Sequence, residues 1–315
     1  MDNVDINLFK FDYDLTMAMF FMNAQSFIYS RYGIRKDGDG TAMQSLEGVK
    51  DAMRKVLDIH KREAARGASP WKPFDTQDLV SFQKDPRRPN GCLHCHHAGY
   101  YMRKEEFSVG RITKETVWGY PLPQNIGIEP DIDRNTIVKD ARDPAARAGV
   151  QTGDRVVSID GQRVVTPADI TWALHAFKGG TLKVVVERGG KNVTASMELK
   201  GADWRKTDVT WRESWWDSGP DIGLKSAELT SDERKPLGLS GDQLALRVTS
   251  VDGNGSAASS GVRADDVIVS VDGKSHDMEA IELQMWIRLT KRSRETTQLG
   301  VVRGSQRQTI AVKLK

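Results

Sequence analysis

Apolar and polar residues follow a pattern near the start of the chain that indicates a strand, a tight turn and a second strand between Ala18 and Gly33. Residues 23–26 favour the turn, because asparagine and serine are common in turns. A helix is predicted after Ser45, a suitable N-cap, because the following apolar residues share one helical face: Leu46, Val49, Met53, Val56 and Leu57. One hairpin and one helix cannot bury both faces of a sheet, so we expect partner elements upstream of Met1.

A repeat with an offset of 112 residues sets the architecture of the rest of the chain, since residues 149–161 align with residues 261–273. Each copy alternates valine or isoleucine with polar residues, as expected of a half-buried strand, and ends in an Asp-Gly pair that favours a hairpin turn. A small-residue turn precedes each copy. A helix and two strands are predicted after it.

These residues resemble the PDZ family in its bacterial, circularly permuted form. The pattern A-A-x-A-G-V-x-x-G-D-x-V-x-x-I-D-G is matched well over residues 117–200 and less well over residues 219–315. The resemblance implies a loop of the form x-apolar-Gly-apolar that presents backbone N–H groups to the C-terminal carboxylate of a peptide. The peptide then adds as a strand beside a groove helix.

The first module matches this loop at Asn125-Ile126-Gly127-Ile128, where glycine would let the backbone approach a carboxylate. Its groove helix is predicted from Pro167 to Phe177. The predicted peptide-binding residues are therefore Asn125, Ile126, Gly127, Ile128, Ile170 and Leu174. The four apolar side chains would also suit the core, so the loop as a whole is better evidence than its members.

The second module matches the loop at Asp221-Ile222-Gly223-Leu224, followed by a polar insertion from Lys225 to Gln243. This departure from the family pattern leads us to favour the first module for ligand binding and to predict a scaffold role for the second.

Composition narrows the class of protein. Among the 315 residues, 46 basic and 43 acidic side chains are interspersed, which indicates a solvated surface and not a nucleic-acid-binding face. Apolar runs are too short for a membrane span. The N-terminus lacks the pattern of a secretory signal, so the chain is predicted to be cytoplasmic if complete as written, and periplasmic or in the cell envelope if the native N-terminus carries a signal.

Both cysteines of the chain lie in Cys92-Leu93-His94-Cys95-His96-His97. The spacing C-x-x-C-H is the attachment signature of c-type haem, in which Cys92 and Cys95 would bind the porphyrin and His96 would ligate the iron. The same residues also suit a dithiol redox pair, a metal site with one nearby histidine, or a structural disulfide. These alternatives stay open.

The resemblance extends upstream. Residues 5–16, the hairpin, the cysteine motif and Trp118-Gly119-Tyr120-Pro121-Leu122-Pro123 together are similar to a bacterial family of thioredoxin-like and PDZ domain-containing selenoproteins. In that family the redox-active cysteine or selenocysteine lies upstream of the matched part, so the resemblance implies an N-terminally truncated chain and a thiol-disulfide oxidoreductase relationship. The predicted class is α+β: a partial thioredoxin-like element at 1–66, a CxxCH segment at 67–116, and PDZ-type β-barrel domains at 117–203 and 204–315.

The leading functional prediction is a PDZ adaptor of the bacterial cell envelope, associated with a redox unit. Its expected partners are peptide C-termini or exposed strands of envelope proteins and a redox partner, with no nucleic acid. One alternative is an electron-transfer protein with haem c that docks through its PDZ pair, and another is a scaffold with occluded grooves. A protease is disfavoured, because too few residues precede the first module for a protease domain and no Gly-x-Ser-x-Gly context occurs.

Overall fold

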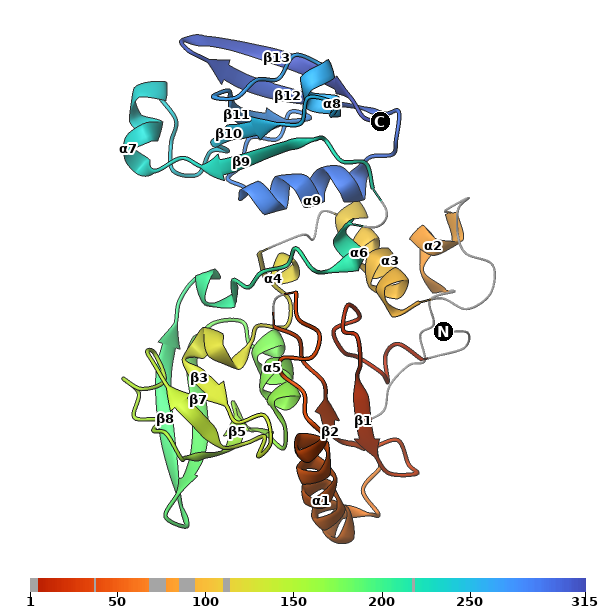
Figure 1. Ribbon diagram of the computed structural model, residues 1–315, viewed down its shortest axis with the longest axis vertical. Coiled ribbons are helices and arrows are strands. Elements are labelled where there is room, and N and C mark those ends of the chain that lie inside the picture. The colour runs from red at the N-terminus through yellow and green to blue at the C-terminus, as the bar shows by residue number, and fades with distance from the viewer. Residues whose placement is uncertain (1–4, 37, 68–77, 85–93, 110–113, 217–218) are drawn as a thin grey trace. The chain divides into compact units, whose positions relative to one another are not determined.

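The computed structural model describes residues 5–36, 38–67, 78–84, 94–109, 114–216 and 219–315. The chain divides into two compact units, of which the first comprises residues 1–101 and 112–212 and the second residues 102–111 and 213–315 (Figure 1). Helices and antiparallel strands occur in both units, which confirms the predicted α+β class. No described helix is long and apolar enough to cross a membrane.

The predicted hairpin and helix form the start of the first unit. Strand β1 (Met19–Met22) pairs antiparallel with β2 (Ile28–Tyr32), and α1 (Leu46–Glu63) follows. The turn is held by Asn23, whose Oδ1 accepts hydrogen bonds from the N–H groups of Gln25 and Phe27. Ser45 is the N-cap of α1 and accepts from the Gly48 N–H at 2.9 Å. Assignment of these elements to a thioredoxin-like fold stays a prediction.

Three short or medium helices are described between α1 and the first module: α2 (Val80–Lys84), α3 (Cys95–Ser108) and α4 (Lys114–Val117).

The first module follows and also belongs to the first unit. Strands β3 and β4 form a two-stranded sheet, and a four-stranded sheet has the order β6-β5-β7-β8. The helix α5 covers the core of this module, where Ile170 and Leu174 are fully buried. The elements are η2 (Pro123–Ile126), β3 (Ile128–Pro130), β4 (Val138–Ala141), β5 (Arg155–Ile159), β6 (Gln162–Arg163), α5 (Pro167–Ala176), β7 (Gly180–Arg188), β8 (Lys191–Leu199) and η3 (Asp203–Arg205).

The second module has the same sequence of main elements, but its strands form one sheet in the order β13-β12-β11-β10-β9. Helix α9 packs its Leu283 and Ile287 side chains into the core, and it lies along the sheet in Figure 1. The elements are α6 (Glu213–Trp216), β9 (Leu224–Glu228), α7 (Ser231–Arg234), η4 (Lys235–Leu237), β10 (Leu246–Val251), α8 (Ser256–Ser259), β11 (Val267–Val271), α9 (Ala280–Thr290), β12 (Thr296–Arg303) and β13 (Gln306–Lys313).

The sequence repeat corresponds to matching strands. Strands β5 and β11 occupy equivalent positions of the two copies. Each is followed by an Asp-Gly pair in which both residues have positive φ, 47° and 79° in the first copy and 45° and 78° in the second. Two consecutive residues with positive φ are typical of the tight turn that joins hairpin strands, and this explains the Asp-Gly pairs.

A buried carboxylate is repeated as well. Asp154 is bonded by the Arg188 guanidinium at 2.7 Å, and Asp266 by that of Arg303 at 2.7 Å. The hydrogen bonds from Arg188 hold the pKa of Asp154 below its ordinary range. Burial opposes the same shift at Asp266, but hydrogen bonds from Arg303 and from the Arg263 N–H outweigh it and lower that pKa too. Each pair ties the strand before the Asp-Gly turn to a later strand of its module.

The segment from Lys225 to Gln243 is only partly an insertion. Lys225 to Glu228 complete strand β9 and pair with β10, and the helices α7 and η4 follow. The predicted polar insertion therefore begins after residue 228, because the first residues of that stretch extend an edge strand.

Candidate functional site

The loop of the first module is engaged within its own fold. The N–H of Gly127 donates to the carbonyl oxygens of Gln124 and Pro123, as a helix C-cap. The Asn125 side chain donates to the carbonyl of Trp204 at 3.0 Å and to that of Lys206 at 2.9 Å. The Gly127 φ of 80° and the nearby backbone of Arg142 explain why glycine is required there.

The apolar residues predicted to line the first groove lie in the core. Ile126, Ile128, Ile170 and Leu174 each have 0% exposure and pack in one cluster. The structure thus brings all four together in the core, and none of them is accessible. Their role in peptide binding stays a prediction.

The face of α5 that points away from this core is covered by the N-terminal part of the same unit. Ile34 and Met43 are buried against Leu122 and Ala168. Tyr120, which belongs to the module itself, also covers α5 by stacking on His175, with ring centroids 4.0 Å apart. Residues 31–36 and 38–45 therefore occupy the side of α5 where a peptide strand was expected; we call them the cover segment.

Hydrogen bonds fix strand β2, which leads into the cover segment, at the start of α5. The Asp169 carboxylate accepts from the Ser30 hydroxyl at 2.7 Å, the Arg31 N–H at 3.0 Å, the Val165 N–H at 2.9 Å and the Thr166 N–H at 3.1 Å. Burial raises the pKa of Asp169, although these four donors act in the opposite direction. The carboxylate joins β2 to α5 across 139 residues of sequence.

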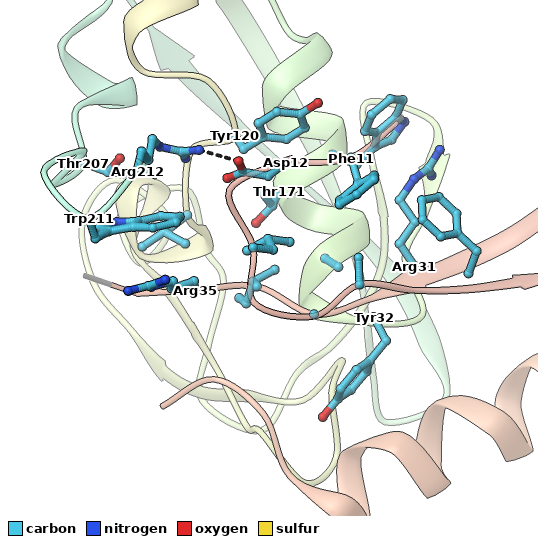
Figure 2. Close-up of a pocket in the computed structure, with 18 of the residues that line it drawn as sticks. Phe11, Asp12, Arg31, Tyr32, Arg35, Tyr120, Thr171, Thr207, Trp211 and Arg212 are labelled. Carbon is cyan, nitrogen blue, oxygen red and sulfur yellow. Dashed lines mark hydrogen bonds and ion pairs between the residues drawn. The ribbon is translucent and has the colours of Figure 1, made fainter. Parts of the chain in front are cut away.

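A small cavity of about 30 Å³ lies beside this contact, lined by residues of the N-terminal part, α5 and residues 207–212 (Figure 2). Arg212 is buried there and forms an ion pair with Asp12, with Asp14 at 3.7 Å. Burial alone would lower the pKa of Arg212, but the two carboxylates outweigh it and raise that pKa. The buried Thr171 hydroxyl has no hydrogen-bond partner among the described residues. The cavity has room for one or two water molecules, not for a peptide.

The second module was expected to bind a peptide, if at all, between β9 and α9. Strand β9 is at the edge of its sheet, with α9 beside it. The Gln284 side chain donates to the Leu224 carbonyl at 3.3 Å, and the Ala280 N–H donates to the Glu228 side chain at 2.8 Å. These two hydrogen bonds join β9 to α9.

The loop of the second module holds a carboxylate of its own. Asp221 Oδ1 accepts from the Gly223 N–H at 2.7 Å, and Asp221 Oδ2 pairs with the Arg288 guanidinium at 2.6 Å. Sequence reasoning missed Gln284 and Arg288. Leu283 and Ile287 take the places of Ile170 and Leu174, so Gln284 and Arg288 correspond to Thr171 and His175, and neither position had been predicted as a site residue.

The cysteine motif is described only in part, because Cys92 lies outside the described residues. Cys95 begins α3. The rings of His94, His96 and His97 lie with centroids 4.5 to 5.6 Å apart. No group of three or more metal-binding side chains is found in the described part of the chain. Haem c with His96 as iron ligand, a dithiol and a metal site all stay predictions.

Comparison with curated proteins finds bacterial relatives that align with part of this chain. It is 30% identical over 142 residues to the "Probable periplasmic serine endoprotease DegP-like" of Pseudomonas fulva (strain 12-X), over 42% of this chain and 28% of that protein. The same name describes a relative from Rhizobium meliloti (strain 1021), 25% identical over 49% of this chain and 30% of that protein. The chain thus spans less than a third of the length of these relatives.

Among solved structures, the chain matches the HtrA3 PDZ domain bound to a phage-derived ligand, with 23% identity, a TM-score of 0.26, and coverage of 30% of this chain and 85% of that chain. The HtrA-type protease AlgW with decapeptide, in its S227A form, matches with 15% identity, a TM-score of 0.30, and coverage of 56% and 53%.

The family model described as "PDZ domain" matches residues 125–199 and 220–314. These stretches coincide with the two modules and together cover more than half of the chain. The chain belongs to the PDZ domain family, which it contains in two copies.

Proposed function

We propose that this protein is a peptide-binding adaptor of the bacterial cell envelope, and that the ligand adds as a strand to β9 of the second module. The observation that carries this proposal is the edge position of β9, where one neutral side chain covers the outward carbonyl of Leu224. The envelope setting is supported by the relatives named as periplasmic proteins.

The backbone of β9 has the right orientation for an added strand. Ser226 lies opposite Val248, whose N–H and carbonyl both bond to the segment before β11. Backbone groups alternate in direction along an antiparallel strand, so those of Ser226 face away from β10. The Leu224 carbonyl also faces outward, as its bond from Gln284 indicates. A peptide strand would find acceptors and a donor in register along this edge.

The free energy needed to admit a peptide strand is lower at β9 of the second module than beside α5 of the first. Opening it requires loss of the neutral bond from Gln284 to the Leu224 carbonyl, which contributes about 1 kcal/mol, and of the bond from the Ala280 N–H to the Glu228 carboxylate, which contributes about 1.5 to 3 kcal/mol. The ligand replaces the first of these bonds. Opening the first groove requires removal of Ile34 and Met43 from a buried cluster, at about 1.5 to 3 kcal/mol for each side chain. The hydrogen bonds to Asp169 from β2 would also break. We therefore replace the preference for the first module with one for the second.

A second candidate function applies to the first module. Its covered helix face favours the scaffold with an occluded groove that the sequence left as an alternative. In this role the first module would hold the N-terminal part of the chain in place, while the second module binds the ligand.

The test compares two substitutions at one position of the full chain. Ser226→Pro removes the outward N–H and is sterically suited to an edge strand. Ser226→Ala removes only the hydroxyl, which is buried without a hydrogen-bond partner among the described residues. Random peptide libraries would be selected on the wild-type protein, and the affinity of the recovered peptides would be measured by fluorescence polarisation.

We expect Ser226→Pro to weaken binding about tenfold or more and Ser226→Ala to change it less than about threefold. Circular dichroism would establish that both variants fold. Recovery of no peptide, or equal affinity for both variants, would refute the proposal.

A further inference from the structure

Two donors converge on one carboxylate in the loop before β9. Asp221 accepts from the Gly223 N–H at 2.7 Å through one oxygen and from the Arg288 guanidinium at 2.6 Å through the other. Arg288 is largely buried, with 12% of its side chain exposed, whereas the Asp221 side chain is 67% exposed. The Arg288 guanidinium is therefore held inside the module, whereas the Asp221 carboxylate lies on its solvent-exposed side.

The donors are held rigidly. Arg288 also donates to the Gly219 carbonyl at 3.2 Å. The Ile222 carbonyl accepts from the Ala257 N–H at 2.8 Å, and the Gly223 carbonyl from the Asp252 N–H at 2.9 Å. A backbone N–H and a guanidinium in fixed positions form a carboxylate-binding site, because charge-assisted hydrogen bonds to both oxygens are strong and directional.

The first module has no equivalent arrangement. Asn125 stands at the position of Asp221, and its side chain donates to carbonyl groups. By the alignment of core residues, His175 stands at the position of Arg288, where it stacks on Tyr120. The carboxylate site is therefore a property of the second module.

We infer that Asp221 acts as a built-in substitute for a peptide's terminal carboxylate, so that the second module selects internal extended segments over free C-termini. This inference rests on the proposed function. A free C-terminus that entered the loop would have to displace Asp221, which is tethered beside the donors and therefore has a high effective concentration. If Asp221 stayed, two negative charges would lie side by side. An internal segment needs only the backbone groups of β9 and meets neither obstacle.

The test uses two forms of the same random peptide library on the full-length protein. One form displays peptides with a free C-terminus, and the other continues into a Gly/Ser tail that removes the terminal carboxylate. The proteins are the wild type, Asp221→Ala, the double variant Asp221→Ala with Arg288→Gln, and Asp232→Ala as a control. Asp232 is an exposed aspartate on α7 that pairs with Lys235, so the control makes the same change in net charge away from the loop.

We expect the wild type and Asp232→Ala to enrich tailed peptides more strongly than free C-termini. Asp221→Ala should shift the ratio toward free C-termini by about tenfold, since charge-assisted hydrogen bonds become available to the ligand. Adding Arg288→Gln should cancel most of this shift. The same ratio would be measured by fluorescence polarisation with one recovered peptide as its free acid and its amide.

Two negative outcomes are distinguishable. If no library is enriched on either the wild type or Asp221→Ala, the proposed function itself fails. If peptides are enriched but the preference does not move in Asp221→Ala, or if the wild type enriches free C-termini as well as or better than tailed peptides, peptide binding stands and the role of Asp221 is refuted.

Discussion

Asp169 is predicted to hold the cover segment on α5, and the substitution Asp169→Ala tests this directly. The substitution leaves four donors without their acceptor: the Ser30 hydroxyl and the N–H groups of Arg31, Val165 and Thr166. An unsatisfied buried donor costs about 1 to 3 kcal/mol. The total is reduced because burial also disfavours the carboxylate, as its raised pKa indicates. We expect a loss of about 3 kcal/mol in the free energy that holds β2 on α5.

Hydrogen–deuterium exchange read by mass spectrometry measures this loss locally. Amides of residues 28–35 should exchange about 100-fold faster in Asp169→Ala, the factor that corresponds to about 3 kcal/mol. The control is Asp140→Ala, which removes an exposed carboxylate paired with Arg142 in the same module and should change stability by less than about 1 kcal/mol. Unchanged exchange over residues 28–35 in Asp169→Ala would refute the argument that this carboxylate anchors the segment.

Two further predictions concern the repeated ion pairs and the cysteine motif. Because the pKa values of Asp154 and Asp266 are lowered in the folded protein, their contribution to stability is present above the ordinary aspartate pKa and is lost as the pH falls through the lowered value. Alanine at either position should cost about 1.5 to 3 kcal/mol at neutral pH and flatten the acid side of the stability profile in urea titrations; an unchanged profile would contradict this. For the cysteine motif, protein exported from a host with haem maturation enzymes should show a Soret band and a haem-stained band on a denaturing gel, both lost in Cys92→Ala and Cys95→Ala. A colourless protein would exclude haem and leave the thiol and metal alternatives.

Local signals in the sequence located most of the fold. The repeat identified β5 and β11 as equivalent strands of the two modules, because alternation and Asp-Gly turns are encoded within a few residues. The N-cap at Ser45 and the groove helix from Pro167 were also found, since capping and helical periodicity are local. The start of the polar insertion was misplaced, because an edge strand tolerates the polar residues that also mark loops.

Site residues were predicted less completely. Ile170 and Leu174 were expected on the groove helix and do lie there, but which face they occupy depends on how α5 is rotated against its sheets. Arg288 carried no signal of its own, because a single arginine on a helix ordinarily lies on a solvated face. Its pairing with Asp221 spans 67 residues and depends on α9 lying beside the loop.

The sequence by itself determined that two PDZ modules are present, where their strands turn, and where the glycine loop and the long helix of each module lie. Those features depend on residue type and on spacing over a few positions. Only the tertiary structure decided which segment packs on α5 and which side chains bond to the loop and strand beside α9. That decision rests on contacts such as Asp169 with β2, Ile34 with Ala168, and Asp221 with Arg288, which join residues far apart in the chain. No local pattern encodes such contacts, because each partner is an ordinary residue until the fold brings the two together.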